Sequence, residues 1–98
     1  MYTIKETPEF QNWLAGIRDL KTRIRLAKRL VKVRNGILGD VELVGDGVSE
    51  MREHFGPGWR MYFVKHGKVI IVMLGVGDKS SQVADIKAVK KILKTLEE

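Results

Sequence analysis

Six consecutive apolar residues, from Val69 to Leu74, constrain the fold more than any other feature of the sequence. A strand that is apolar at every position has no face to turn toward water, so it predicts a place in the interior of a sheet, buried on both faces. Two more strands are expected before it, at residues 48–55 and 59–65. They are separated by short glycine-containing turns, Gly56-Pro57-Gly58 and His66-Gly67-Lys68, which are typical of antiparallel hairpins. The three strands therefore predict an antiparallel meander.

Helical patterns are expected on both sides of the meander. After a short strand at residues 2–6, Thr7-Pro8-Glu9 supplies a capping hydroxyl, a proline suited to the first helical position and a carboxylate for the positive end of the helix dipole. The pattern bends near residues 16–19 and ends at Asn35-Gly36, which predicts either one kinked helix or a helical hairpin. Its apolar stripe, expected to face the core while the basic side chains face outward, is Phe10, Trp13, Leu14, Ile17, Leu20, Ile24, Ala27 and Val31.

The last helix is expected to begin near Ser80-Ser81, and residues 39–47 are expected to form a loop. The predicted order of elements is β-α-α-β-β-β-α. This is an α+β fold in which an antiparallel meander packs against the N-terminal helical hairpin or kinked helix and against the C-terminal helix. With 98 residues the chain is too short for two ordinary domains, so we expect residues 1–98 to form a single domain.

The composition favours a soluble globular protein without membrane segments. Hydrophobic residues make up 44% and charged residues 31% of the chain, which is ordinary for such proteins. The apolar run is far below the roughly 20 residues needed to span a bilayer, and the N-terminus lacks signal-peptide architecture. The sequence has no cysteine and two histidines, which argues against a metal site and is compatible with a cytoplasmic location. We expect no metal, no cofactor and no membrane partner.

The net charge of +6 is concentrated in one segment. Residues 18–34 hold eight Lys or Arg side chains and one acid, Asp19, whereas the rest of the chain holds ten basic and eleven acidic side chains. Such concentration predicts an anionic partner, either nucleic acid or an acidic protein segment. The residues expected to form this basic surface are Arg18, Lys21, Arg25, Lys28, Arg29 and Lys32.

Cationic side chains also gather along the predicted sheet. Strand alternation puts Glu50, Arg52 and His54 on one face of their strand. A three-residue turn sets Arg52 opposite Arg60, and two like charges in that position require an acid or a bound anion between them. A phosphate suits two guanidinium groups, because they bind its oxygens through charge-assisted hydrogen bonds. Lys79, just after the last strand, is a third cation that the fold brings toward this surface.

Each of these residues also has a purely structural explanation. With a four-residue turn the two arginines no longer face each other, and salt bridges to Glu50 and Glu53 make them an ordinary solvated face. Aromatic residues such as Trp59 and Tyr62 more often pack in a core than serve as surfaces for base stacking. A histidine near a turn is more often a surface residue than an acid or base, and Lys79 serves equally well as a solvated loop cation.

Several spaced motifs are similar to one known family over nearly the whole chain. The motifs are Trp13-Leu14, Arg18-Asp19, Gly45-Asp46-Gly47-Val48-Ser49-Glu50-Met51-Arg52, Gly56-Pro57-Gly58-Trp59-Arg60-Met61-Tyr62-Phe63 and Gly77-Asp78-Lys79-Ser80-Ser81-Gln82-Val83-Ala84-Asp85-Ile86. Together with the predicted order of elements, they resemble the phage-derived, HigB-like branch of the RelE/ParE toxins, often named addiction module killer proteins. The resemblance implies a small RelE-like fold.

The resemblance also implies a cytoplasmic toxin of a type II toxin–antitoxin pair. Its partners would be a cognate antitoxin, expected to be of helix-turn-helix type, and the ribosome with its messenger RNA. Operator DNA would be reached only through the antitoxin. RelE-like members cut messenger RNA in the ribosomal A site without a metal. The 2′-hydroxyl of the RNA attacks the adjacent phosphate, and basic residues on the sheet stabilise the charge of that phosphate.

By motif, Arg60 matches the sheet arginine of the family and is expected to stabilise the phosphate. Arg52 occupies a strand position where relatives carry a cation, and Lys79 lies near the basic residue that follows the last strand. His54 is the candidate acid or base, because histidine has an unperturbed pKa near neutrality.

The sequence departs from the RelE pattern at two places. RelE-like enzymes use a tyrosine in the C-terminal segment, whereas no aromatic residue follows Phe63 here, and Glu50 stands where they place a lysine. The residues expected to contact substrate are Tyr62, Trp59 and Asp85, and Tyr62, Asp85 and His54 are the candidates to replace the missing tyrosine. Two other functions stay open: a ParE-like inhibitor of DNA gyrase, and a non-catalytic nucleic-acid-binding module that uses the basic helix.

Overall fold

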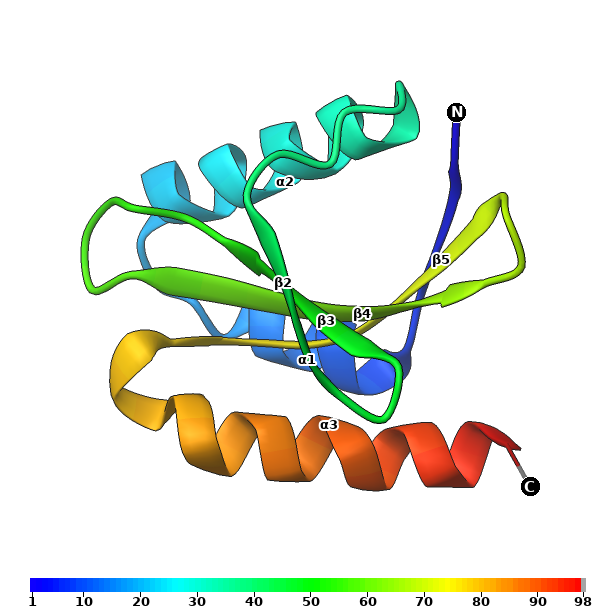
Figure 1. Cartoon of the computed structure of the whole chain (residues 1–98). Helices are drawn as coiled ribbons and strands as arrows, with labels where there is room; N and C mark the ends of the chain where they lie inside the picture. Colours follow the sequence, from blue (N-terminus) through cyan, green and yellow to red (C-terminus); the bar gives the residue numbers. More distant parts are fainter. Residues whose placement is uncertain (98) are drawn as a thin grey trace.

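The apolar run forms most of strand β5 (Ile70–Asp78), which lies in the interior of a five-stranded sheet. In this computed structural model, which describes residues 1–97, the strands lie in the order β1-β5-β4-β3-β2 (Figure 1). The other strands are β1 (Thr3–Glu6), β2 (Val41–Gly45), β3 (Val48–Arg52) and β4 (Trp59–His66). β1 runs parallel to β5, and the remaining neighbours are antiparallel. The predicted α+β fold, with the apolar strand buried between its neighbours, is confirmed.

Helices cover both faces of the sheet. α2 (Leu20–Arg34) lies over one face, and α3 (Gln82–Glu97), which follows the short 3-10 helix η1 (Lys79–Ser81), lies over the other (Figure 1). α1 (Pro8–Ala15) packs beside β5. It begins as predicted at Thr7, whose hydroxyl accepts a hydrogen bond from the amide of Phe10 at 3.1 Å. Within residues 1–97, none of the helices has the length and apolar character required to cross a membrane.

The bend expected near residues 16–19 is a complete break between two helices, so a single kinked helix is excluded. The break also changes which side of the second helix is buried. The exposed members of the predicted apolar stripe are Leu20 (60%), Ile24 (45%) and Val31 (50%), and Ala27 is exposed as well. Leu26, Leu30 and Val33 face the core instead. The predicted stripe is therefore wrong for α2, because helical phase is not carried across a non-helical segment.

The segment 39–47, expected to be a loop, contains the edge strand β2. It pairs antiparallel with β3 after a tight turn at Gly45-Asp46-Gly47, where Asp46 has a φ of 55°. Leu43 on this strand is 69% exposed. An edge strand of this kind is held by backbone pairing more than by side-chain burial, so its apolar pattern is weak. The sheet thus has one more strand than predicted.

Two apolar clusters form the core, one on each face of the sheet. Under α2 the buried members are Phe10, Leu26, Leu30, Val33, Met51, Met61, Phe63, Ile71, Met73 and Val76. Under α3 they are Val48, Tyr62, Leu74 and Val89. Trp13 from α1 contacts both clusters. The sheet is therefore a fixed platform, and its loops at one end are available for function.

Gly75 permits close packing on the α3 face. A Cβ atom at this position would lie 2.8 Å from Cγ1 of Val89 and closer still to the indole ring of Trp13. We expect Gly75→Ala to lower the free energy of unfolding by about 1–3 kcal/mol through overpacking. Urea denaturation measures this cost. It should be smaller in a Trp13→Ala background, which removes the nearest atoms, and equal costs in the two backgrounds would contradict the packing explanation.

Tyr62 predicts a pH dependence of stability. Burial, with a further contribution from the Glu50 carboxylate, raises the pKa of its phenol above the usual 10.0. Because unfolding lowers this pKa back toward 10, stability is unaffected below pH 10 and falls as the pH rises above it. In Tyr2→Phe, whose one tyrosine is Tyr62, phenolate absorbance should appear together with unfolding. Phenolate formed while the far-ultraviolet circular dichroism is still native would contradict this.

Candidate functional site

A recess of about 240 Å³ opens at the end of the sheet, between the loop that joins β3 to β4 and the start of η1. Its lining residues are Glu53, His54, Gly56, Pro57, Gly58, Arg60 and Lys79. Three of the four residues predicted to be catalytic, Arg60, His54 and Lys79, therefore meet in one place. We call it the Arg60 recess.

Turn geometry brings these distant parts of the sequence together. The amide of Gly58 donates to the carbonyl of Phe55 at 3.1 Å, which closes the turn. Gly58 itself has a φ of 81°, a conformation that favours glycine. Trp59 pairs with Asp78 across β4 and β5, so Lys79 comes next to the turn. A Cβ on Gly58 would lie 3.4 Å from Cβ of Lys79 and 3.6 Å from Nη1 of Arg60.

Arg60 has a buried guanidinium with incompletely satisfied donors. The side chain is 9% exposed, and its Nε lies 3.9 Å from Oε1 of Glu50, which is too long for a hydrogen bond. Glu50 instead accepts hydrogen bonds at both carboxylate oxygens from the side-chain Nε2 of Gln82, at 3.0 and 3.1 Å. Within residues 1–97 the Nε of Arg60 has no hydrogen-bond acceptor, and its Nη1 reaches only the carbonyl of Trp59, at 3.3 Å. An anion in the recess would offer acceptors to the terminal nitrogens of the guanidinium.

Arg52 stands directly opposite Arg60 in the strand register, as the three-residue turn predicted. Its guanidinium, however, is bound by two carboxylates. Nη2 lies 3.0 Å from Oδ1 of Asp40, and Nη1 lies 2.6 Å from Oε2 of Glu42. Arg60 in turn lies within ion-pair distance of Glu50, so acids on and beside β2 and on β3 offset the repulsion between the two arginines. Arg52 is not part of the Arg60 recess in this structure.

His54 lies at the rim of the Arg60 recess and is 72% exposed. Its Nε2 is 2.6 Å from Oδ2 of Asp40. Hydrogen bonds from Arg52 and then His54 hold the pKa of the Asp40 carboxyl below its usual value, so this acid stays ionised near neutrality. Asp40 orients the imidazole, and the sequence did not single it out because it lies in the segment expected to be a loop.

Lys79 is exposed on the opposite side of the Arg60 recess. It is the first residue of η1, which Asp78 caps by accepting a hydrogen bond from the amide of Ser80 at 2.8 Å. The hydrogen bonds from Ser80 hold the pKa of Asp78 below its usual value. The cap fixes the backbone at Lys79, while its long side chain is free to follow a ligand.

The residues predicted to contact substrate, Tyr62, Trp59 and Asp85, are not among those that line the Arg60 recess. Tyr62 is fully buried under α3 and offers no surface for a base to stack on. Trp59 packs against the core on the other face, beneath the β3–β4 loop. Asp85 accepts a hydrogen bond from the hydroxyl of Ser81 and packs over Gly77. In this structure all three pack against other parts of the fold, and a direct role toward substrate stays a prediction.

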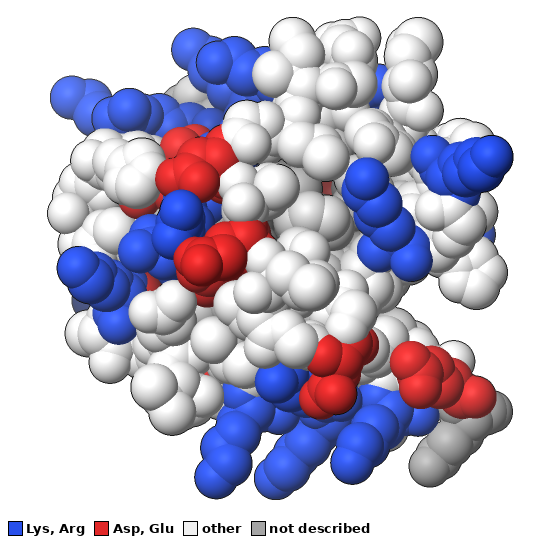
Figure 2. All heavy atoms as spheres, in the orientation of Figure 1, with Lys and Arg blue, Asp and Glu red and all other residues white. Residues whose placement is uncertain are grey.

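The basic surface on α2 is smaller than predicted. Arg18, Lys21, Arg25, Lys28 and Lys32 are exposed, as expected. Basic side chains gather along α2 in Figure 2, and a second group projects from α3. Arg29 is different, because it is 9% exposed and its donors are taken by protein groups. Arg29 therefore has a structural role here, and the exposed basic surface is formed by the other five cations.

No metal-binding arrangement is evident in the described part of the chain. Residues 1–97 contain no group of three or more His, Cys, Asp or Glu side chains placed to hold a metal ion. The Arg60 recess is lined by two cations, one histidine and one acid, Glu53, which sequence reasoning did not place there. A set of this kind suits an anion better than a cation.

Comparisons with known proteins found similarity both in sequence and in structure. A protein of Haemophilus influenzae, described as uncharacterized, is 34% identical over 93 residues, which are 95% of this chain and 94% of that protein. A mutant of the E. coli toxin RelE in the free state has a TM-score of 0.70 and 22% identity, over 93% of this chain and 97% of that one. No family model matches the sequence. The chain thus belongs to the same family as the Haemophilus influenzae protein, and its fold is that of the toxin RelE.

Proposed function

We propose that this protein is the toxin of a toxin–antitoxin pair and that it cuts messenger RNA on the ribosome. The observation that carries the proposal is the Arg60 guanidinium, which is buried and under-satisfied beside a recess that also holds Lys79 and His54. The RelE fold and the motifs quoted above support the same assignment. We also propose that the protein belongs to the HigB-like branch of these toxins.

The proposed reaction needs no group beyond RNA and protein. The 2′-hydroxyl oxygen attacks the adjacent phosphorus, the bond from phosphorus to the 5′-oxygen breaks, and the products are a 2′,3′-cyclic phosphate and a 5′-hydroxyl. Negative charge builds on the phosphate oxygens in the transition state, where Arg60 and Lys79 stabilise it. His54, oriented by Asp40, is the candidate to take the proton from the 2′-hydroxyl or to supply one to the leaving oxygen.

The size of the Arg60 recess supports a requirement for the ribosome. A volume of about 240 Å³ holds a phosphodiester and part of a ribose, but not a run of bases. None of the lining residues is a Phe, Tyr or Trp side chain, and the single ring among them, His54, is bound to Asp40. The recess therefore has no surface that reads bases, and a second macromolecule must hold the RNA strand in place. The ribosome performs that task in this proposal, which also places the protein in the cytoplasm.

An antitoxin is the second proposed partner. The exposed apolar residues Leu20 and Ile24 line a groove of about 410 Å³ between α1 and α2, which Leu14 and Arg23 also line. Exposed apolar groups along a helix are typical of a surface that another protein covers. Basic residues beside the groove favour an acidic antitoxin segment. We propose that the antitoxin, of helix-turn-helix type, also carries the complex to operator DNA.

One observation favours inhibition of DNA gyrase as the second candidate function. The chain lacks an aromatic residue after Phe63, and Tyr62 is buried, so no tyrosine is available at the recess. A protein-targeting toxin of the ParE kind would need no such residue.

Brief induction of the gene in growing cells separates the two functions. Transcriptome-wide mapping of RNA 5′ ends should show new ends at a fixed position within codons if the protein cuts messenger RNA on the ribosome. DNA damage and stalled replication without such ends would overturn the ribonuclease proposal in favour of gyrase. Ends without codon phase would overturn the ribosome-dependent mechanism.

A further inference from the structure

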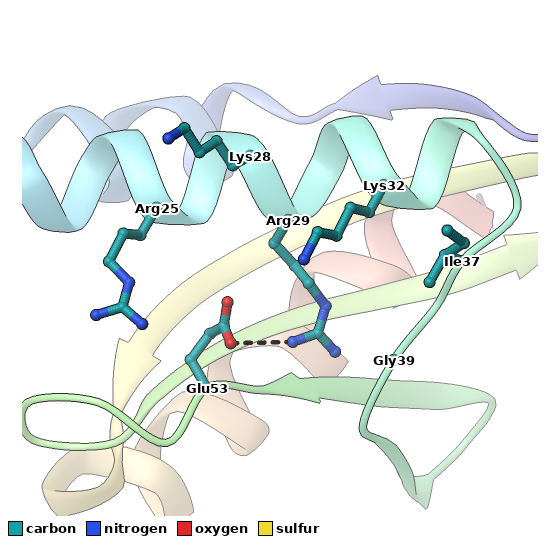
Figure 3. A pocket seen from close by; sticks show the side chains of 7 residues that line it. All are labelled: Arg25, Lys28, Arg29, Lys32, Ile37, Gly39 and Glu53. Atoms are coloured by element: carbon teal, nitrogen blue, oxygen red, sulfur yellow. Dashed lines mark hydrogen bonds and ion pairs between the residues drawn. The ribbon is translucent and has the colours of Figure 1, made fainter.

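A second recess, of about 340 Å³, lies between α2 and the segments that flank the first hairpin. Its lining residues are Arg25, Lys28, Arg29, Lys32, Ile37, Gly39 and Glu53, and Figure 3 shows them. We call it the helix recess. Four of its seven lining residues are cations, and one is an acid.

Internal pairing leaves three of these cations without an anionic partner. Arg29 and Glu53 neutralise each other at 3.1 Å. Within residues 1–97, Arg25, Lys28 and Lys32 take part in no ion pair, although Arg25 lies over the ring of Phe55 at 3.7 Å from its centroid. Like charges three and four residues apart on one helix repel each other. A bound anion would relieve that repulsion.

The protein holds the helix recess in a fixed shape. Arg29 donates to the carbonyls of Leu38 and Asp40, both at 2.9 Å, and to the carbonyl of Arg52 at 2.9 Å. These bonds tie the segment after α2 to the helix and to the end of β3. Gly39 lies so close that a Cβ atom there would be 3.0 Å from Nη2 of Arg29. The wall formed by residues 38–40 is therefore set by partly buried hydrogen bonds and not by mobile surface groups.

The helix recess adjoins the Arg60 recess. Glu53 lines both, and Phe55, on which Arg25 stacks, belongs to the loop that forms the Arg60 recess. Because Glu53 is paired with Arg29, it presents little net charge to a strand that passes over it. Cations thus stand on both sides of one neutralised position, a pattern that suits successive phosphates of one backbone.

We propose that the helix recess is a second phosphate subsite for single-stranded RNA, occupied by a backbone phosphate away from the one held at Arg60. The assignment rests on the proposed function and adds a second point at which the protein contacts the RNA backbone. The contiguity of the two recesses favours RNA over an acidic protein segment here. The apolar groove at Leu20 and Ile24, which has the character of a protein-binding surface, is a separate site.

The test is a nuclear magnetic resonance titration with a 2′-O-methylated RNA hexamer, which the proposed reaction cannot cut. Amide signals of Gly39 and Gly58 report on the helix recess and the Arg60 recess, and both should shift with one dissociation constant. Lys28→Gln/Lys32→Gln should weaken binding roughly tenfold and reduce the slope of log affinity against log salt by about 1.4. The matched control is Lys87→Gln/Lys91→Gln, with the same spacing and charge change on the exposed side of α3.

The outcomes separate the subsite from the function. A Gly58 shift without a Gly39 shift overturns the second subsite and leaves the Arg60 assignment standing. A Gly39 shift without a Gly58 shift supports the subsite and counts against the Arg60 recess as the RNA site. Equal loss of affinity in the two lysine pairs shows general charge attraction and overturns the subsite. Tighter binding of a glutamate-rich peptide at Gly39 overturns it in favour of a protein partner.

Discussion

Replacing Arg60 by alanine is expected to slow RNA cleavage by a factor of about 10²–10³, the loss typical of one preorganised donor in a transition state. The guanidinium is already held at the recess wall by burial and by Glu50, so little reorganisation is needed when charge develops on the phosphate. Primer extension on messenger RNA incubated with programmed ribosomes measures the rate. In growing cells the same variant should relieve the arrest of translation.

Arg52→Ala is the matched control for Arg60→Ala. The two arginines pair directly across β3 and β4, but Arg52 is already bound by Asp40 and Glu42. Its loss should therefore slow cleavage much less. Both variants must first show native circular dichroism and cooperative unfolding, because Arg60 is buried beside Glu50. If folded Arg60→Ala cleaves at the wild-type rate, or if Arg52→Ala loses as much activity, the phosphate role of Arg60 is wrong.

Replacing Arg29 by alanine is expected to lower the free energy of unfolding by about 3–5 kcal/mol, the cost of breaking a buried ion pair by removing one partner. The change leaves the carbonyls of Leu38, Asp40 and Arg52 and the carboxylate of Glu53 without their donor. Each of these bonds joins α2 to a different part of the β-sheet or its loops. Urea denaturation with a linear extrapolation measures the loss.

The control for Arg29→Ala comes from the same helix. Lys32→Ala removes a positive charge one turn away, but Lys32 is exposed, so its cost should stay within about 0.5 kcal/mol. Arg29→Met tests whether the hydrogen bonds matter beyond packing, and it should recover little of the loss because methionine donates none of them. A loss below about 1 kcal/mol for Arg29→Ala would contradict the structural role of Arg29 and favour the prediction that it belongs to the basic surface.

Local sequence patterns were sufficient to predict those parts of the fold that depend on neighbouring residues. The apolar run that forms β5, the Thr7 cap and the three-residue turn that sets Arg52 against Arg60 were all predictable, since each depends on neighbouring residues. The same register and turn rules brought Arg60, His54 and Lys79 to one end of the sheet. Their chemical roles stay predictions.

The features that could not be predicted depend on which segments the chain brings together. The break before α2 resets the helical phase, so Arg29 turns inward and Ile24 outward. Strand β2 gains its stability from pairing with β3, which its own residues do not reveal. Asp40 therefore could not be recognised as the shared partner of Arg52 and His54. If the pairing of β2 with β3 were known, the alternation of side chains along the two strands would place Asp40 beside Arg52.

The central claim is that the Arg60 recess promotes attack by the RNA's own 2′-hydroxyl on ribosome-bound messenger RNA. The most direct test uses purified protein, ribosomes stalled at a defined codon, and two messenger RNAs that differ in one atom. One is unmodified, and the other carries a 2′-deoxy nucleotide at the position of the cut. We expect cleavage of the first, with a 2′,3′-cyclic phosphate at the new end, and none of the second. Cleavage of the deoxy-substituted RNA, or of neither RNA, would contradict the claim.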